Sequence, residues 1–295
     1  MNLEAISGSG TVAIACTFVF LLAAKSWQLV ARSMSAHPNF PDAIMREAAQ
    51  RFRDQLEMLT RKQSTYLGAG LMFVIIFAVA QTFEARRLFE GYPTWQLYVL
   101  LATLLAAAGF ALYRLACTIR EGRQVRFLRD ANIAVGHSSQ RIATGHARVF
   151  HDVVTAAGVI DHVMIGQSGI YAVNVVAHRE IRRQSVERAE DELRFTPGGH
   201  TIGISDIANR TTRLEQEFRD LLGHSVRVRS VIAVPGSDAG SQCSAGHLVV
   251  NERTLPMLRG WRDRADYLLD EDVQTLHQLL NRTCKRSPIA RRKGE

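Results

Sequence analysis

The chain has 295 residues, of which 47% are hydrophobic and 22% are charged, and its formal net charge is +8. This length accommodates one membrane module and one globular domain of ordinary size. The four cysteines contain no CxxC pair, which argues against a disulfide scaffold and indicates free thiols on the reducing side of a membrane. The excess of positive charge is compatible with an anionic membrane surface or with nucleic acid.

Three long apolar runs lie before residue 118 and predict transmembrane helices. They cover residues 9–31, 66–83 and 95–117. The second run has no charged residue and would form about 27 Å of helix, close to the thickness of a bilayer core. The first run lacks the basic segment of a signal peptide, because Met1–Gly10 contains no Lys or Arg. The alternative is a soluble protein with buried core helices.

The distribution of Lys and Arg predicts the orientation of these helices. The first eight residues contain none, the loop 84–94 contains two and the loop 32–65 contains six. Five more arginines cluster from Arg114 to Arg129. The positive-inside rule places the N-terminus outside and the large C-terminal part in the cytoplasm. We therefore expect an integral protein of a bacterial inner (plasma) membrane, with the lipid bilayer as a partner.

A helix is predicted from Pro41-Asp42 to about residue 65. Apolar residues recur in it at a spacing of three to four and form one stripe, at Ile44, Ala48, Phe52, Leu56 and Leu59. Such a stripe packs against a neighbouring helix, such as 119–128, or against its own copy. A homo-oligomer through the membrane and stalk helices is therefore one expectation, and a helix on the membrane surface is the alternative. The helix can also continue into the second span.

After residue 131 the pattern predicts a soluble α/β domain. Its elements, in chain order, are a helix from residue 132, strands at 148–154, 159–166 and 170–177, a helix at 206–222, strands at 228–235 and 247–250, and helices near 254–267 and 270–283. An antiparallel meander followed by a helix and a strand predicts a mixed sheet flanked by helices. The predicted organisation is a transmembrane region at 1–131, this domain at 132–255, and C-terminal helices with a basic tail at 256–295.

The segment Val159-Ile-Asp-His-Val-Met-Ile-Gly-Gln-Ser-Gly-Ile-Tyr-Ala-Val173 carries a specific motif. It resembles the central signature of the nuclease-related domain (NERD) family, in which Asp-His, G-x-x-G and I-E-x-K are separated by hydrophobic residues. Gly136–Ile142 occupies the place of the family's G-x-x-G-E helix start, and Val149–Val153 matches its first strand. The resemblance covers about residues 132–255. It implies a restriction-endonuclease-like fold, whose active members use a D…(E/D)-x-K site.

In such a site the two acids hold a divalent cation, preferably Mg²⁺, and the lysine stabilises developing charge. The resemblance assigns the strand aspartate to Asp161. The glutamate position holds Asn174, the lysine position holds Val176, and the helix glutamate of many members corresponds to Gln140. One acid of three remains and the cation is missing. Asp161 is thus the one carboxylate left as a candidate metal ligand. The alternative is that Asp161 has a structural role and is hydrogen-bonded to nearby backbone or to His162.

Other residues offer less for metal chemistry. No pair among His151, His162 and His178 has a tight zinc spacing. Glu180 lies on the same strand face as Asn174 if the third strand continues that far. It would then be an acid that has moved along the strand from the glutamate position of the motif.

Basic residues are candidates for binding nucleic acid or lipid. They lie after the third strand and in the tail, at Arg179, Arg182, Arg183, Lys285, Arg286, Arg291, Arg292 and Lys293. Such runs are usually solvated faces, but they suit anionic lipid or a phosphate backbone. No aromatic residues interleave with them, so base stacking has no support.

The sequence therefore predicts a membrane-anchored NERD protein with a degenerate active site, acting as a cytoplasmic binding or scaffolding module. No cofactor is expected. The alternative is a metal-dependent nuclease, acting on DNA or RNA with Mg²⁺ at an altered site built on Asp161. A third possibility is that the membrane part carries the function. Only Lys25 and Arg114 are ionisable within the spans, both near ends, so a transport pathway has little support.

Overall fold

The computed structural model describes residues 12–26, 45–82, 93–143, 145, 147–177, 185–189, 192–196, 199–238, 242–244, 246–259 and 266–285. The chain divides into two compact units. We call the first the helical unit, Met1–Asn39 with Gln55–Arg123, and the second the sheet unit, Phe40–Asp54 with Gln124–Glu295.

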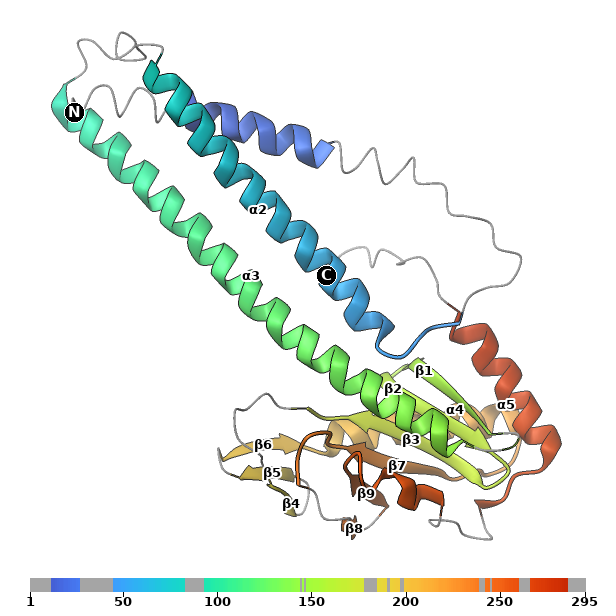
Figure 1. Ribbon diagram of the computed structural model, residues 1–295. Coiled ribbons are helices and arrows are strands. Elements are labelled where there is room, and N and C mark those ends of the chain that lie inside the picture. The colour runs from blue at the N-terminus through green and yellow to red at the C-terminus, as the bar shows by residue number, and fades with distance from the viewer. Residues whose placement is uncertain are drawn as a thin grey trace. The chain divides into compact units, whose positions relative to one another are not determined.

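The helical unit contains the apolar helices (Figure 1). They are Val12–Ser26, most of α2 (Gln50–Thr82) and the first part of α3 (Thr94–Ile142). Among the described residues one helix is long and apolar enough to cross a membrane, over Gln50–Val79. The structure thus supports one candidate span, where the sequence predicted three. Val12–Ser26 is a shorter apolar helix, and the third apolar run lies within α3.

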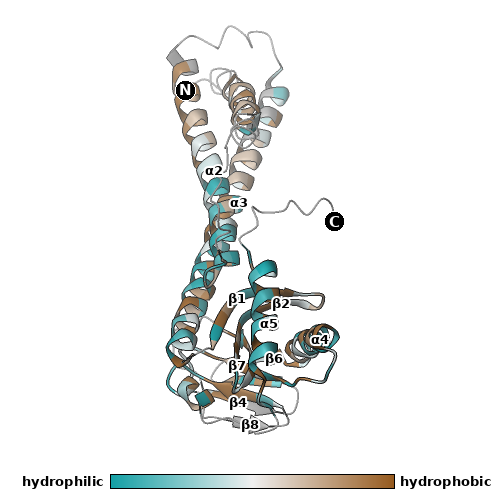
Figure 2. Cartoon of the chain, turned by 90° about the vertical axis from the view of Figure 1, so that its right-hand side faces the viewer, coloured by the Kyte–Doolittle hydropathy of each residue, from teal (hydrophilic) through white to brown (hydrophobic). Residues whose placement is uncertain are grey.

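Apolar side chains of α2 and α3 point outward from this unit. Leu71 is 63% exposed, Phe110 is 66% exposed and Leu112 is 67% exposed. Figure 2 shows the apolar residues gathered toward one end of each of these helices. Large exposed apolar patches commonly mark surfaces that contact a membrane or another protein.

Helix α2 begins later than the sequence predicted. The expected start was near Asp42, whereas the helix begins at Gln50. Ala49 adopts the left-handed conformation, with φ of 62°, and Met45 forms an antiparallel bridge with Lys285. Both features break the helical backbone before Gln50. From there α2 is continuous to Thr82, so the amphipathic segment and the second apolar run form one helix.

The sheet unit is built on a six-stranded mixed sheet in the order β1-β2-β3-β7-β9-β8. The strands are β1 (Arg148–Thr155), β2 (Gly158–Gly166), β3 (Gly169–Val175), β7 (Val228–Ala233), β8 (Gln242–Ser244) and β9 (His247–Val250). β1, β2 and β3 form an antiparallel meander, β3 pairs with β7 and β7 with β9 in parallel, and β8 is antiparallel to β9. The predicted mixed sheet flanked by helices is confirmed.

A second, three-stranded sheet was not predicted. It comprises β4 (Ser185–Ala189), β5 (Glu192–Thr196) and β6 (His200–Gly203), in the polar stretch that follows β3. Leu193 and Phe195 of β5 are fully buried while Arg194 between them is exposed. This short alternation is the signal that identifies the strand.

Helices cover both faces of the six-stranded sheet. α4 (Ser205–Leu222) and α5 (Asp270–Thr283) pack on one face, where Phe218 and Leu276 are fully buried in one cluster with β1–β3. The end of α3 and the 3₁₀ helix η2 (Leu255–Arg259) pack on the other, through Val135 and Leu258. The helix predicted from residue 132 is therefore the end of α3, because no proline interrupts the chain between Thr94 and Ile142. Gly136–Ile142 forms the last turns of a helix, where the resemblance suggested a helix start.

Candidate functional site

The site begins with a break in the side-chain alternation of β1 and β2. Phe150 and Val153 lie three residues apart, yet both join the same core cluster, and so do Ile160 and Val163 on the neighbouring strand. Strict alternation would place the two members of each pair on opposite faces. The break occurs at Asp152, whose φ is 51°.

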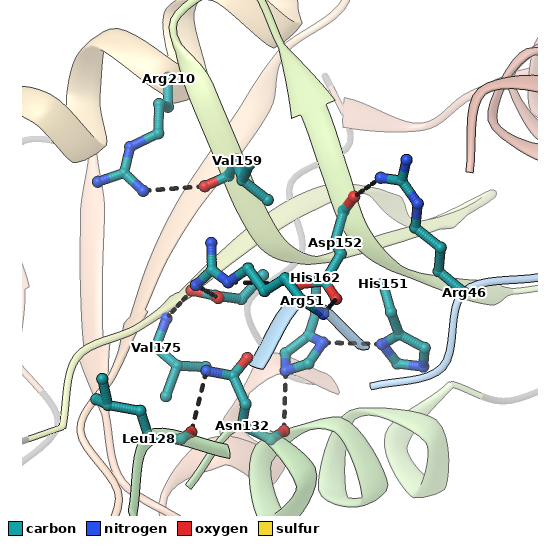
Figure 3. Close-up of polar contacts among 11 residues, drawn as sticks. Arg46, Arg51, Leu128, Asn132, His151, Asp152, Val159, His162, Val175 and Arg210 are labelled. Atoms are coloured by element: carbon teal, nitrogen blue, oxygen red, sulfur yellow. Dashed lines mark hydrogen bonds and ion pairs between the residues drawn. The ribbon is translucent and has the colours of Figure 1, made fainter. Parts of the chain in front are cut away.

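Two carboxylates are buried where the alternation breaks. Asp152 of β1 and Asp161 of β2 are each 2% exposed. Both are held by Arg51, in the first turn of α2 (Figure 3). Its Nη2 donates to Asp161 Oδ1, and its Nε lies 3.6 Å from Asp152 Oδ1. A cation at the N-terminus of a helix is unfavourable, because the helix dipole is positive at that end. The two carboxylates offset this positive charge.

The backbone around α2 strengthens this arrangement. The backbone N–H of Arg51 donates to Asp152 Oδ2 at 3.0 Å, and the Arg46 guanidinium donates to the carbonyl of Asp152 at 2.7 Å. The second oxygen of Asp161 accepts the N–H of Val175 at 2.7 Å. Burial raises the pKa of both carboxyls, while Arg51 lowers it for each. The charged forms therefore depend on the guanidinium.

Asn174, Val176 and Gln140 hold the other positions assigned by the resemblance. In the described part of the chain they form no hydrogen bonds with one another. Asn174 of β3 is 2% exposed, and neither atom of its amide has a hydrogen-bond partner among the described residues. The Val176 N–H donates to the carbonyl of Ala233, and its side chain packs on the apolar cluster under the small sheet. Gln140 contacts His151 instead, with 3.0 Å between Nε2 atoms.

His151 and His162 form a buried hydrogen-bonded pair whose tautomers follow from their partners. His162 Nε2 lies 3.2 Å from the carbonyl of Asn132, which only accepts, so this nitrogen carries the proton. His162 Nδ1 is then the acceptor, and His151 Nδ1, 2.8 Å away, is the donor. His151 Nε2 accepts the Gln140 amide. All four ring nitrogens are satisfied with both rings neutral.

The pKa values agree with neutral rings. Burial lowers the pKa of His151 to about 4, with a contribution from His137. Burial and the neighbouring His151 lower the pKa of His162 to about 3. Neither ring offers a free lone pair to a metal.

The residues at this site do not fit a divalent cation. Mg²⁺ requires several oxygen ligands that are free to approach it. Both oxygens of Asp161 are occupied, by Arg51 and by the Val175 N–H, and the guanidinium itself places positive charge beside both acids. Among the described residues no group of three or more His, Cys, Asp or Glu side chains could hold a metal ion.

The predicted basic candidates lie almost entirely outside the described residues. Lys285 is described: it is exposed and bridges to Met45. The others outside the described part are Arg179, Arg182, Arg183, Arg286, Arg291, Arg292 and Lys293, together with His178 and Glu180.

Sequence reasoning missed Arg51 and Asp152. Arg51 lies 110 residues from Asp161 in the chain, and nothing in its amphipathic helix distinguishes it from the neighbouring surface arginines. The positive φ of Asp152 leaves no sequence signal, because glycine does not occupy the position.

The ion pairs of Arg51 predict a measurable coupling. Arg51→Met leaves two buried carboxylates without their cation and should lower the free energy of unfolding of the full chain by about 1–3 kcal/mol, less than for a fully buried pair because Arg51 is partly exposed. Asp161→Asn in the Arg51→Met background should restore part of the loss. Arg53→Met, which removes an exposed pair with Glu47, is the control and should cost less than about 1 kcal/mol. Urea unfolding in detergent measures five proteins: the natural sequence, Arg51→Met, Asp161→Asn, the double variant and Arg53→Met. Strictly additive effects of Arg51→Met and Asp161→Asn would contradict the pairing.

The histidine pair predicts acid sensitivity. The folded pKa values lie below the unfolded value of about 6.5, so the unfolded chain binds more protons between about pH 6.5 and 4. The contribution of the two neutral histidines to the free energy of unfolding is therefore fully present above about pH 6.5. It declines as the pH falls, by up to ~1.4 kcal/mol per pH unit for each histidine. The raised pKa of the two buried carboxyls acts in the opposite sense. Replacing one histidine by His151→Gln should reduce the slope between pH 6.5 and 5, measured by urea unfolding. An unchanged slope would show that the pair is not neutral in the folded state.

Comparison with known proteins supports the resemblance. Residues 130–235 match the family model described as NERD, nuclease-related domain. This range runs from the end of α3 to just beyond β7 and includes Asp161, Asn174 and Val176. No curated protein and no solved structure gave a match to the chain. The recognition from sequence is confirmed: the chain contains a nuclease-related domain over residues 130–235.

Proposed function

We propose that this is a membrane-anchored NERD protein whose nuclease-like site is degenerate and serves as an attachment point. It acts as a cytoplasmic binding or scaffolding module. The observation that carries the proposal is the position of Arg51: its guanidinium pairs with Asp161 and Asp152, where catalysis would need a metal ion. A restriction-endonuclease-like fold is part of the proposal, supported by the β1–β3 meander that leads through α4 to the parallel strand β7.

The chemistry of the site supports the degenerate reading. Hydrolysis of a phosphodiester needs stabilisation of charge that develops in the transition state, and losing one such group commonly costs a factor of about 10²–10³. The glutamate position holds a neutral amide, Asn174, and the lysine position holds Val176, whose side chain packs among apolar residues. The remaining acid is paired with Arg51.

The same contacts suggest what the site does instead. Arg51 lies in the first turn of α2, and α2 continues unbroken to Thr82. Among the described residues this helix contains the candidate membrane span. The acid retained from the family motif therefore holds the beginning of the membrane helix. We infer that this ion pair holds the first turn of α2 on the sheet unit, and that α2 continues from there into the proposed anchor.

The membrane part of the proposal has three spans, an outer N-terminus and a cytoplasmic sheet unit in a bacterial inner membrane. The exposed apolar side chains of α2 and α3 and the positive-inside pattern support it. Exposed apolar residues beyond the apolar runs, such as Met58, support contact with a second copy.

Cysteine labelling tests the topology. In a variant without the native cysteines, Lys285→Cys should resist a membrane-impermeant thiol reagent in intact cells and react after permeabilisation. Ser7→Cys, in the first eight residues, which contain no Lys or Arg, should react in intact cells. Labelling of Lys285→Cys from outside would reverse the orientation.

The alternative is a metal-dependent nuclease that acts on DNA or RNA through an altered site. The observation in its favour is the second buried carboxylate, Asp152, which like Asp161 is held by Arg51. The two carboxylates would become metal ligands only if Arg51 left them. Nucleic acid is the ligand class that this alternative implies.

Purified full-length protein should therefore not cleave plasmid DNA or RNA with Mg²⁺ or Mn²⁺. The reason is that Asn174 replaces one metal-binding acid, and that the remaining acid, Asp161, is paired with Arg51. Arg51→Met, which frees the two carboxylates, should also remain inactive, because neither Asn174 nor Val176 can replace the missing groups. Activity of the natural sequence that Asp161→Ala abolishes would support the nuclease and refute the degenerate site.

A further inference from the structure

An apolar groove lies on the sheet unit away from the Arg51 site. It is bounded by α4 and α5, and its volume is about 420 Å³. Both helices pack on β1, and Figure 2 shows them next to each other. Phe218 and Leu280 form its buried floor, while Val154 and Leu221 at its edge are 56% and 43% exposed. Val154 belongs to a strand and Leu221 to a helix, so the exposed apolar surface is continuous across two elements.

The rim of the groove is acidic. Glu217 and Asp220 of α4 both line it. Glu217 is partly engaged, by Arg213 at 3.7 Å and by the N–H of Ala156 at 3.3 Å. Asp220 is exposed and has no ion pair with any residue in the described ranges. An apolar floor with an acidic rim suits a segment that carries apolar residues next to cations.

The chain itself contains such a segment close by. Thr283, in the last turn of α5, lines the groove, and the description of the chain ends two residues later at Lys285. The next ten residues are Arg-Ser-Pro-Ile-Ala-Arg-Arg-Lys-Gly-Glu. Ile289 lies four residues beyond Lys285 and is therefore within about 14 Å of it when the chain is extended. Because the segment is tethered, its effective concentration at the groove is high.

We propose that the tail, residues 286–295, docks in this groove of its own domain. Pro288, Ile289 and Ala290 cover the exposed apolar edge at Val154 and Leu221, and Arg291-Arg292-Lys293 face the acidic rim. The groove is thus an internal binding site for a basic segment, independent of the nuclease-related site and of whether that site is active.

Disulfide trapping in the full chain tests the docking. In detergent-solubilised protein without native cysteines, Leu221→Cys with Ile289→Cys should cross-link within one chain under mild oxidation. The matched control pairs Ile289→Cys with Tyr267→Cys, which is 57% exposed and lines a different pocket. Cross-linking of the Leu221 pair well above the control is expected. Equal yields, or cross-links only between chains, would overturn the proposal.

Charge reversal then tests the acidic rim. Asp220→Lys should lower the intramolecular yield about two- to five-fold, the effect of a surface ion pair. Arg291→Glu in the Asp220→Lys background should restore it. Glu192→Lys, an exposed acid on β5, is the control and should leave the yield unchanged. If Asp220→Lys has no effect, or if vesicles with anionic lipid abolish the cross-link, the tail belongs to solvent or to the membrane and the proposal fails.

Discussion

The guanidinium of Arg51 between two buried carboxylates sets the local structure of the sheet unit. Asp152 and Asp161 are each 2% exposed, and two unpaired negative charges at that depth would be strongly unfavourable. Arg51 compensates both, which requires the first turn of α2 to lie against β1 and β2. The backbone adapts to the same requirement. Asp152 adopts φ of 51° and receives the Arg51 N–H, and Ala49 turns the chain into the helix with φ of 62°.

Close packing around the histidine pair, His151 and His162, depends on a small residue in α3. A Cβ at Gly136 would come within 2.9 Å of Ala48 Cβ and 3.2 Å of His162 Cε1. The glycine thus lets the α2 entry segment and the histidine pair approach the same turn of α3. Neutral histidines are the appropriate residues in that position, because a charged ring would be buried beside the Arg51 cation. The hydrogen-bond chain from Gln140 to the carbonyl of Asn132 keeps both rings neutral without leaving a buried nitrogen unpaired.

Periodic patterns made much of the fold predictable, and contacts distant in the chain made the rest unpredictable. β1–β3, α4 and α5 were placed within one or two residues because their apolar spacing is strong and their turns are marked. The short strands β4–β6 were missed because they span four or five residues each and bury few side chains, such as Val186 in β4 and Leu193 and Phe195 in β5. Asp161 was found through the family motif. Its partner Arg51 was not, because a salt bridge formed over 110 residues leaves no mark in local sequence.

Val176, at the position where the resemblance implies a lysine, has a structural role in the sheet unit. Val176 packs against the cluster that joins the small sheet to the main one, with Val186, Phe195 and Val234 among its members. A lysine there would bury its stem among these residues and either carry an ammonium into an apolar environment or displace the small sheet. The positive charge near Asp161 comes instead from α2, a different element. The element that supplies this charge, α2, continues to Thr82 and contains the candidate membrane span of the described residues. The ion pair of Arg51 with Asp161 therefore compensates a buried acid and also holds the first turn of α2 against β2.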